Sequence, residues 1–230
     1  KLNVMINFLN VIIIFDGVYD SYLKTHHIEI LEGYGTTELS PVVAVNRIGN
    51  VRLGSIGLPL EGLEIKICAI DSDEALAVGM EGRLLVKGPN VMPGYMGDPE
   101  ATAQIIKDGW YDTGDMAMID EDGFIFHKGR LKRFIKIGGE MISMVRIEEE
   151  VQAVIPPHTQ ICAVAKHHEI KGAEIAIAFK GEFDSQKVRH ELSQKLPPLF
   201  IPKIFVPMDT IPLLGTGKVN FREVERIINA

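Results

Sequence analysis

The sequence predicts an α+β protein built from two structural units. Apolar residues alternate at a spacing of two in several short segments, as half-buried strands require. A smaller number of segments carry apolar residues at helical spacing, and capping residues such as Asp98 and Asn220 mark their starts. The pattern changes at residues 130–133, where basic residues separate a strand-rich region from one that mixes helices and strands. We therefore expect one unit over residues 1–129 and a second over residues 130–230.

The composition is that of an ordinary globular protein. The 230 residues are 46% hydrophobic and 24% charged, which is enough apolar material for one or two cores. The net charge of −7 and the lack of a long basic run argue against a nucleic-acid partner. Cys68 and Cys162 stand alone in apolar stretches, which predicts reduced core thiols in a cytoplasmic protein rather than disulfides or zinc ligands.

The apolar run at residues 2–15 is predicted to be a buried strand of a larger domain. A bilayer span takes about 20 residues, and asparagines interrupt this shorter run. The residues that follow form a poor signal-peptide cleavage site. We therefore expect a soluble chain.

The first unit is expected to contain short strands and turns with one helix. That helix begins at Asp98-Pro99, because a capping carboxylate followed by proline is typical of a helix start. Strands are expected at residues 28–31, 63–67 and 83–87, and a hairpin joins residues 116–119 to 124–126.

The second unit is expected to mix both kinds of element. Pro156 should end a helix that carries apolar residues at positions 147, 151 and 155. Strands are expected at residues 161–166 and 174–179, a further helix begins at residue 184 or 185, and a capping box at Asn220 starts the last helix.

Four segments carry residue types suited to chemistry. In EGYGTTE, residues 32–38, glycines allow close backbone approach, threonines can bond phosphate, and Glu38 can hold Mg²⁺. In YDTGD, residues 111–115, a carboxylate at the end of a glycine-containing turn can accept both hydroxyls of a ribose. Taken singly, a polar turn would explain each of the two segments.

The other two segments are basic or glycine-rich. GRLKRFIKIGGE, residues 129–140, interleaves cations with apolar residues, which suits a polyanion, a mobile joint or an ordinary amphipathic strand. PLLGTGK, residues 212–218, lacks the first glycine and the final Ser or Thr of a nucleotide phosphate loop. What remains is Lys218 on a loop of small residues, able to move into a site.

Together and in this order, the four segments resemble the signatures of the adenylate-forming enzymes, which include acyl-CoA synthetases, luciferases and peptide-synthetase adenylation domains. Within this family, the sequence is most similar to the synthetase half of acyl-[acyl-carrier-protein] synthetase / 2-acylglycerophosphoethanolamine acyltransferase proteins. The segments that carry this similarity are ILEGYGTTE, RLLVKGPNVMPGY and GRLKRFIKIGGEMIS. The resemblance implies the distal part of a large AMP-binding domain over residues 1–129 and a small α+β lid over residues 130–230, with a hinge at residues 130–133.

The resemblance also implies a role for individual residues. Gly33, Tyr34 and Gly35 would line the nucleotide site, with Tyr34 against the adenine, and Thr37 and Glu38 would meet the phosphate and Mg²⁺. Asp115 and Arg130 would hold the ribose, Lys132 would be the hinge, Gly138 and Gly139 would line the thiol route, and Lys218 would act in adenylation.

The activity implied is that of an acid–thiol ligase in fatty acid and phospholipid metabolism. It would use ATP and Mg²⁺, form an acyl-AMP from a fatty acid or other carboxylic acid, and pass the acyl group to acyl-carrier protein or CoA. The parent enzyme would be cytoplasmic, with an association with the inner membrane left open. The family's loop for the β- and γ-phosphates is not found here, so we expect it upstream of residue 1 and expect this C-terminal fragment to be inactive alone.

Two alternatives stay open. The chain could derive from an amino-acid adenylation domain, because the acyl pocket that decides the substrate is largely outside it. It could also be a catalytically inactive module that binds nucleotide or carrier.

Overall fold

The computed structural model describes residues 3–7, 25, 28–168, 172–215 and 217–230. The chain divides into two compact units, Lys1–Leu131 and Lys132–Ala230. The boundary between the units lies within residues 130–133, where the sequence pattern predicted it. The assignment of the two units to part of an AMP-binding domain and to a lid stays a prediction.

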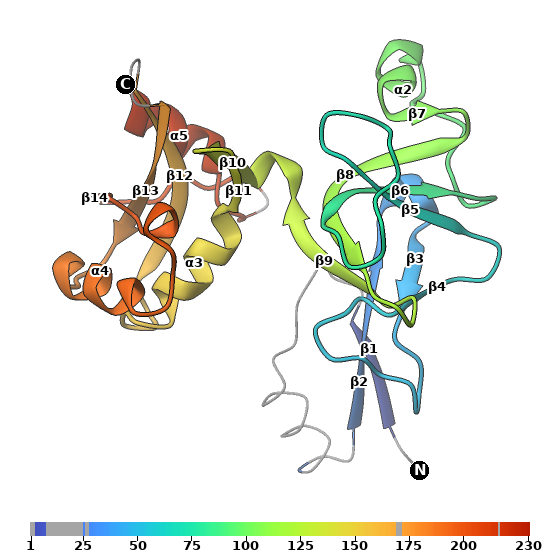
Figure 1. Cartoon of the computed structure of the whole chain (residues 1–230), viewed down its shortest axis with the longest axis horizontal. Helices are drawn as coiled ribbons and strands as arrows, with labels where there is room; N and C mark the ends of the chain where they lie inside the picture. Colours follow the sequence, from blue (N-terminus) through green and yellow to red (C-terminus); the bar gives the residue numbers. More distant parts are fainter. Residues whose placement is uncertain (1–2, 8–24, 26–27, 169–171, 216) are drawn as a thin grey trace. The chain divides into compact units, whose positions relative to one another are not determined.

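The first unit is built mainly from strands (Figure 1). Its elements are β1 (Asn3–Asn7), β2 (Ile28–Gly35), a 3-10 turn η1 (Thr37–Leu39), β3 (Val42–Val45), β4 (Leu58–Pro59), β5 (Glu64–Cys68), β6 (Gly82–Lys87), α2 (Pro99–Ile105), β7 (Ile106–Lys107), β8 (Trp110–Ile119) and β9 (Ile125–Arg130).

Two sheets share the core of this unit. One has the strand order β1-β2-β3-β4, in which β1 runs parallel to β2 and the other pairs are antiparallel. The other has the order β5-β6-β8-β7, and β9 pairs with β8. Buried side chains from both sheets, including Val43, Leu84 and Ile125, meet in one apolar cluster. Burial of these apolar surfaces holds the two sheets together.

The second unit mixes helices and strands. Its elements are η2 (Leu131–Arg133), which bridges the boundary, β10 (Phe134–Ile137), β11 (Glu140–Ser143), α3 (Met144–Gln152), β12 (Gln160–His168), β13 (Gly172–Lys180), α4 (Ser185–Ser193), η3 (Pro198–Phe200), β14 (Ile204–Pro207) and α5 (Phe221–Asn229).

Helices cover both faces of the β12-β13-β14 sheet. Ala163, Ile175 and Ile177 pack in one cluster with apolar residues of α3 and α4. The alternate residues Cys162 and Val164 pack in a second cluster with residues of α5. Successive side chains of a strand point to opposite faces, so this alternation places α3 and α4 on one face and α5 on the other.

The α+β class predicted from the sequence is confirmed, and most of the expected elements are present. Asp98 caps α2 by accepting from the amide of Ala101, and Asn220 caps α5 by accepting from the amide of Glu223. The capping box is incomplete, because the Glu223 carboxylate pairs with Arg226 instead of reaching back to Asn220. The described part of the apolar run, Asn3–Asn7, is a strand, and residues 8–15 lie outside the described residues.

Two segments expected as loops or turns lie in strands. Residues 32–35 belong to β2, and residues 111–115 lie within β8. Helix α2 ends at Ile105, because β7 and β8 form a hairpin directly after it. Asp108 and Gly109 form its two-residue turn with positive φ at both positions, as a type I′ turn requires.

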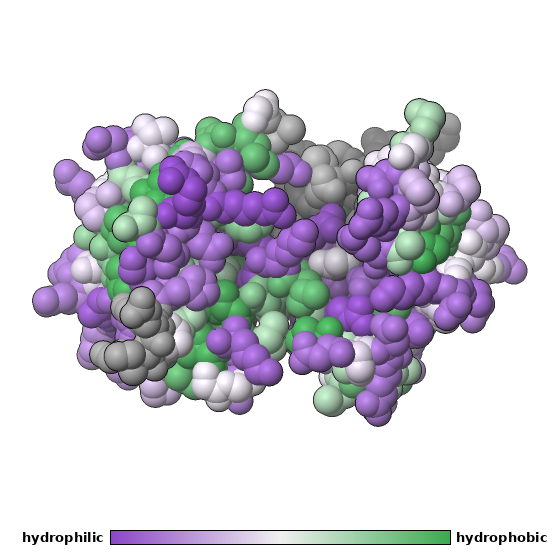
Figure 2. All heavy atoms as spheres, turned by 90° about the horizontal axis from the view of Figure 1, so that it is seen from above, coloured by the Kyte–Doolittle hydropathy of each residue, from purple (hydrophilic) through white to green (hydrophobic). Residues whose placement is uncertain are grey.

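Figure 2 shows hydrophilic side chains over much of the visible surface, with apolar patches between them. Exposed apolar side chains include Met96 in the first unit and Leu213 and Leu214 in the second. Among the described residues, no helix has the length and apolarity that crossing a membrane demands. Cys68 and Cys162 are free and buried, as the sequence predicted.

Replacing Ile177 tests the core of the second unit. Its side chain is fully buried, so Ile177→Ala should lower the free energy of unfolding by about 2–5 kcal/mol through lost burial and a cavity. Ile227 on α5 is 42% exposed, and Ile227→Ala should cost less than about 1 kcal/mol. Urea unfolding followed by circular dichroism measures both values. Equal costs would contradict the described packing.

Candidate functional site: a buried carboxylate and an exposed lysine loop

A bulge in β8 positions Asp115. Arg83 pairs with Met116 and Leu85 pairs with Asp112, so Leu84 alone faces residues 113–115. The Thr113 hydroxyl donates to the Leu84 carbonyl at 2.9 Å and accepts from the Asp115 amide at 3.1 Å. Gly114 has a φ of 68°, in the left-handed region that favours glycine. The Thr-Gly-Asp sequence therefore builds a bulge within a strand, where a turn was expected.

The Asp115 carboxylate is buried and surrounded by three side chains. The Tyr34 hydroxyl donates to Oδ2. Arg130 Nε lies 3.0 Å from Oδ1 and His127 Nε2 lies 3.4 Å from the same atom. The Asp115 side chain is 1% exposed, whereas the Arg130 side chain is 55% exposed. The structure thus brings together Tyr34, Asp115 and Arg130, which the sequence had singled out separately.

His127 is a member of this group that the sequence did not reveal. The amide of Gly129 donates to His127 Nδ1 at 3.2 Å, so Nδ1 carries the lone pair and the neutral ring carries its proton on Nε2, toward Asp115. The rings of His127 and Tyr34 lie 5.6 Å apart. Inward alternation along β9, with Ile125 and His127 both buried, is the sequence signal that could have identified it.

Oδ1 of Asp115 is buried and accepts no hydrogen bond from the residues that the structure describes. Its two nearest polar neighbours are the Arg130 guanidinium, with which it forms an ion pair, and the His127 imidazole. Arg130 also donates from Nη1 to the Thr113 carbonyl at 3.0 Å, which holds its guanidinium beside the carboxylate. Carboxylate and guanidinium side by side offer an acceptor and donors to a polar ligand such as a diol.

Glu38 lies in the same region. Its Oε1 accepts from the Tyr95 hydroxyl at 2.9 Å, and its carbonyl accepts from the Met92 amide at 2.9 Å. Burial, followed by the negative charge of Glu38, raises the pKa of Tyr111 to about 12, while Arg130 lowers it. The Tyr111 hydroxyl is therefore within electrostatic reach of both the Glu38 carboxylate and the Arg130 guanidinium. Thr37, at the start of η1, is exposed.

The glycines of the first motif have packing roles. A Cβ on Gly35 would lie 1.6 Å from the Pro41 carbonyl oxygen, so only glycine fits there. Gly33 is buried and pairs with Val45 across the sheet. Tyr34 is 4% exposed, so its ring is largely covered as it stands. A role for these three residues in holding a nucleotide stays a prediction.

Lys218 lies on a closed loop of the second unit. Leu213 pairs with Val219, the Leu214 amide donates to the Lys218 carbonyl at 2.7 Å, and Gly217 has a φ of 81°. The Lys218 side chain is exposed, and within the described part of the chain it has no ion-pair partner. The loop therefore presents a free ammonium group.

The remaining predicted residues also lie in the second unit. Lys132 is exposed in η2. Gly138 and Gly139 form the two-residue turn between β10 and β11 with φ values of 59° and 93°, as a type I′ turn requires. This hairpin gives a structural reason for both glycines, and their place on a thiol route stays a prediction.

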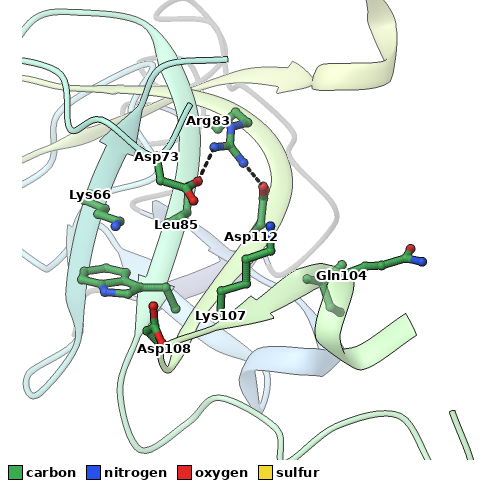
Figure 3. A pocket seen from close by; sticks show the side chains of 10 residues that line it. Lys66, Asp73, Arg83, Leu85, Gln104, Lys107, Asp108 and Asp112 are labelled. Atoms are coloured by element: carbon green, nitrogen blue, oxygen red, sulfur yellow. Dashed lines mark hydrogen bonds and ion pairs between the residues drawn. The ribbon is translucent and has the colours of Figure 1, made fainter. Parts of the chain in front are cut away.

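A separate hollow lies on the first unit, lined by β5, β6, α2 and the β7–β8 hairpin (Figure 3). Arg83 pairs there with Asp73 and Asp112, and Lys66 lies 4.4 Å from the centroid of the Trp110 ring. Lys107 and Asp108 complete its charged lining. No residue singled out from the sequence lines it.

Comparisons with known proteins agree with the fold and indicate a family. Residues 17–96 match the family model described as AMP-binding enzyme. Feruloyl-CoA synthase of an Amycolatopsis species is 34% identical over 203 residues, which cover 85% of this chain and 41% of that protein. A long-chain-fatty-acid–CoA ligase of Escherichia coli is 35% identical over 212 residues, 90% of this chain and 37% of that protein.

Solved structures show the same fold. ATP-bound MatB from Rhodopseudomonas palustris matches with a TM-score of 0.80 and 26% identity, over 93% of this chain and 43% of that chain. O-succinylbenzoate coenzyme A synthetase (MenE) from Bacillus subtilis, in complex with AMP, matches with a TM-score of 0.82 and 22% identity, over 96% and 46% of the two chains.

The fold is consistent with a fragment of the adenylate-forming fold. The family match and the relatives support the AMP-binding enzyme family for this chain, with acyl-CoA synthetases among its homologues. The chain spans 41% of the feruloyl-CoA synthase and 37% of the fatty-acid ligase that it matches. The particular acyl-carrier-protein synthetase named by the resemblance is a finer assignment, and we take it up as a proposal.

Removing the Tyr34 hydroxyl tests the buried group. Tyr34→Phe leaves Oδ2 of Asp115 without its donor and should cost about 1–3 kcal/mol at pH 7. Tyr95 is 40% exposed, and Tyr95→Phe should cost less than about 1 kcal/mol.

The Tyr34 hydroxyl should also make the free energy of unfolding depend on pH. Burial and the nearby Asp115 raise the pKa of Tyr34, whereas an unfolded tyrosine ionises near its ordinary value of 10.0. Above that pH the unfolded chain releases its proton first, so stability falls as the pH rises. Urea unfolding at pH 8–11 should show a steeper loss for the wild type than for Tyr34→Phe. Parallel curves would contradict the raised pKa.

Proposed function

We propose that this chain is part of an ATP-dependent acid–thiol ligase that makes an acyl-adenylate and passes the acyl group to a thiol. The observation that carries the proposal is the buried Asp115 carboxylate, whose Oδ1 accepts no hydrogen bond from the described residues and has the half-exposed Arg130 beside it. Relatives named as CoA synthetases and CoA ligases support the same chemistry. The matching structure of MatB, which is 26% identical and has ATP bound, supports the nucleotide.

In this proposal the first unit holds the nucleotide. Asp115 and Arg130 bind the ribose hydroxyls of ATP, and Tyr34, with Gly33 and Gly35 beside it in β2, borders the adenine. Tyr34 and His127 hold the Asp115 carboxylate from the protein side. Thr37, exposed at the start of η1, bonds the α-phosphate.

The Glu38 carboxylate is suited to be a ligand of Mg²⁺. One of its oxygens accepts from Tyr95, which leaves the other oxygen available. Among the described residues, no three or more His, Cys, Asp or Glu side chains come together as a metal site. A single carboxylate suits Mg²⁺, which prefers to complete its shell with water and substrate phosphates. Bound there, the ion would supply positive charge to the phosphates.

The reaction has two steps. The substrate carboxylate attacks the α-phosphorus of ATP, an acyl–phosphate bond forms, and the bond to the pyrophosphate leaving group breaks. Like charges meet in this step, and the free ammonium of Lys218 would offset them. A thiol then attacks the acyl carbon, AMP leaves, and a thioester forms. Lys132 is the proposed pivot between the steps, and Gly138 and Gly139 the proposed thiol route.

The proposed substrate is a fatty acid and the proposed acceptor is the phosphopantetheine thiol of acyl-carrier protein or CoA. The fatty-acid–CoA ligases among the relatives support the acid and CoA. The motifs ILEGYGTTE and GRLKRFIKIGGEMIS support the acyl-carrier-protein synthetases. The proposed location is the cytoplasm, where ATP and both acceptors are available.

Removing the Lys218 ammonium in the full-length protein tests this mechanism. Lys218→Ala should slow fatty-acid-dependent ATP–pyrophosphate exchange at least about 100-fold, because one cation at the transition state is lost. Transfer from a supplied acyl-adenylate to the thiol should persist, because that step does not bring the same charges together. Lys187, exposed on α4, gives the control, and Lys187→Ala should leave both steps unchanged.

The outcomes separate the proposals. ATP–pyrophosphate exchange that depends on amino acids but not on fatty acids would reject the fatty-acid substrate in favour of an amino acid. No exchange with any acid would leave a binding module and overturn the ligase. Equal loss of both steps in Lys218→Ala would reject the role of the lysine.

A further inference from the structure

Arg133 lies in the second unit with its side chain 11% exposed. Its Nη1 donates to the Ala163 carbonyl at 3.1 Å, and its Nη2 pairs with Glu148 of α3. Glu148 also accepts from the Ala163 amide at 2.7 Å. A largely buried guanidinium with these partners is fixed in place, because moving it would leave the Glu148 carboxylate without its cation.

The same guanidinium reaches the base of the Lys218 loop. Its central carbon lies 4.9 Å from the centroid of the Phe221 ring, a cation–π contact. Phe221 is the first residue of α5, and Asn220 before it donates from its amide to the Pro212 carbonyl at 2.8 Å, which closes the loop. Arg133 therefore connects η2, α3 and β12 with the closing point of the lysine loop.

We infer that Arg133 is a positioning residue for Lys218. Through the ring of Phe221 it holds the base of the lysine loop to η2, immediately after the proposed pivot at Lys132. A rotation of the backbone at Leu131 and Lys132 then carries the loop with it as one body. The inference rests on the proposed function, because it assumes that Lys218 acts in adenylation and not in transfer.

Arg133 could instead stabilise the second unit without any effect on Lys218. The two roles differ in what a substitution changes. If Arg133 only stabilises the unit, its substitution should lower the melting temperature and the rates of both half-reactions together. If Arg133 positions Lys218, its substitution should lower the rate of adenylation alone. The same substitution should cause no further loss of rate once Lys218 is removed.

Two variants of the full-length protein test the inference. Phe221→Leu keeps an apolar side chain against α5 and removes the ring, while the Arg133–Glu148 pair stays. Arg133→Lys keeps a positive charge beside Glu148 and loses the planar guanidinium. Arg189, whose guanidinium lies 5.4 Å from the Phe205 ring of the same unit, gives the control Arg189→Lys.

Both half-reactions are measured as ATP–pyrophosphate exchange with a fatty acid and as transfer from a supplied acyl-adenylate. Phe221→Leu and Arg133→Lys should each slow exchange about tenfold, the value of one desolvated cation–π contact. Transfer should stay within about twofold, and the control should change neither step. In a Lys218→Ala background, Phe221→Leu should cause no further loss of exchange.

Three results would overturn the inference: equal loss of both half-reactions, an unchanged exchange rate in Phe221→Leu, or an independent loss in the Lys218→Ala background. If Arg133→Lys does not fold, Phe221→Leu decides alone. An unchanged exchange rate in Lys218→Ala itself would instead reject the proposed role of the lysine, and with it any need to position it.

Discussion

Burial of the Asp115 carboxylate is the constraint on which the first unit depends. A buried charge is costly unless donors and cations surround it, and here Tyr34, His127 and Arg130 do so. Tyr34 belongs to the β1–β4 sheet, whereas Asp115, His127 and Arg130 belong to the sheet that contains β8 and β9. The same carboxylate thus links two sheets and is also the group that we propose binds the ligand.

The groups proposed for chemistry are divided between the two units. The first unit contributes a fixed, largely buried set around Asp115, together with Glu38. The second contributes an exposed ammonium on a closed loop, and Arg133 ties the base of that loop to η2. In the proposed function, a rigid nucleotide site and a lysine that moves with its own unit would suit a reaction in two steps, because the lysine would be needed in only one of them.

Much of the fold followed from local patterns in the sequence. Caps at Asp98 and Asn220 and strand alternation marked elements correctly, because each depends on neighbours in the chain. The Thr-Gly-Asp bulge was not foreseen, because it depends on pairing with Leu84, nearly 30 positions earlier. His127 was missed for the same reason, since its value comes from contacts with Asp115 and Tyr34 that only the sheets create. Motif resemblance named Asp115 and Arg130 but gave no reason for their proximity.

Ribose recognition by Asp115 is tested most directly by calorimetric binding of AMP and 2′,3′-dideoxy-AMP to the full-length protein and to Asp115→Asn. If Asp115 and Arg130 bind the ribose hydroxyls, the wild type should prefer AMP by at least about tenfold. Asp115→Asn should lose that preference while its affinity for the dideoxy compound stays unchanged. Equal binding of the two nucleotides by the wild type, or a preserved preference in Asp115→Asn, would contradict the account.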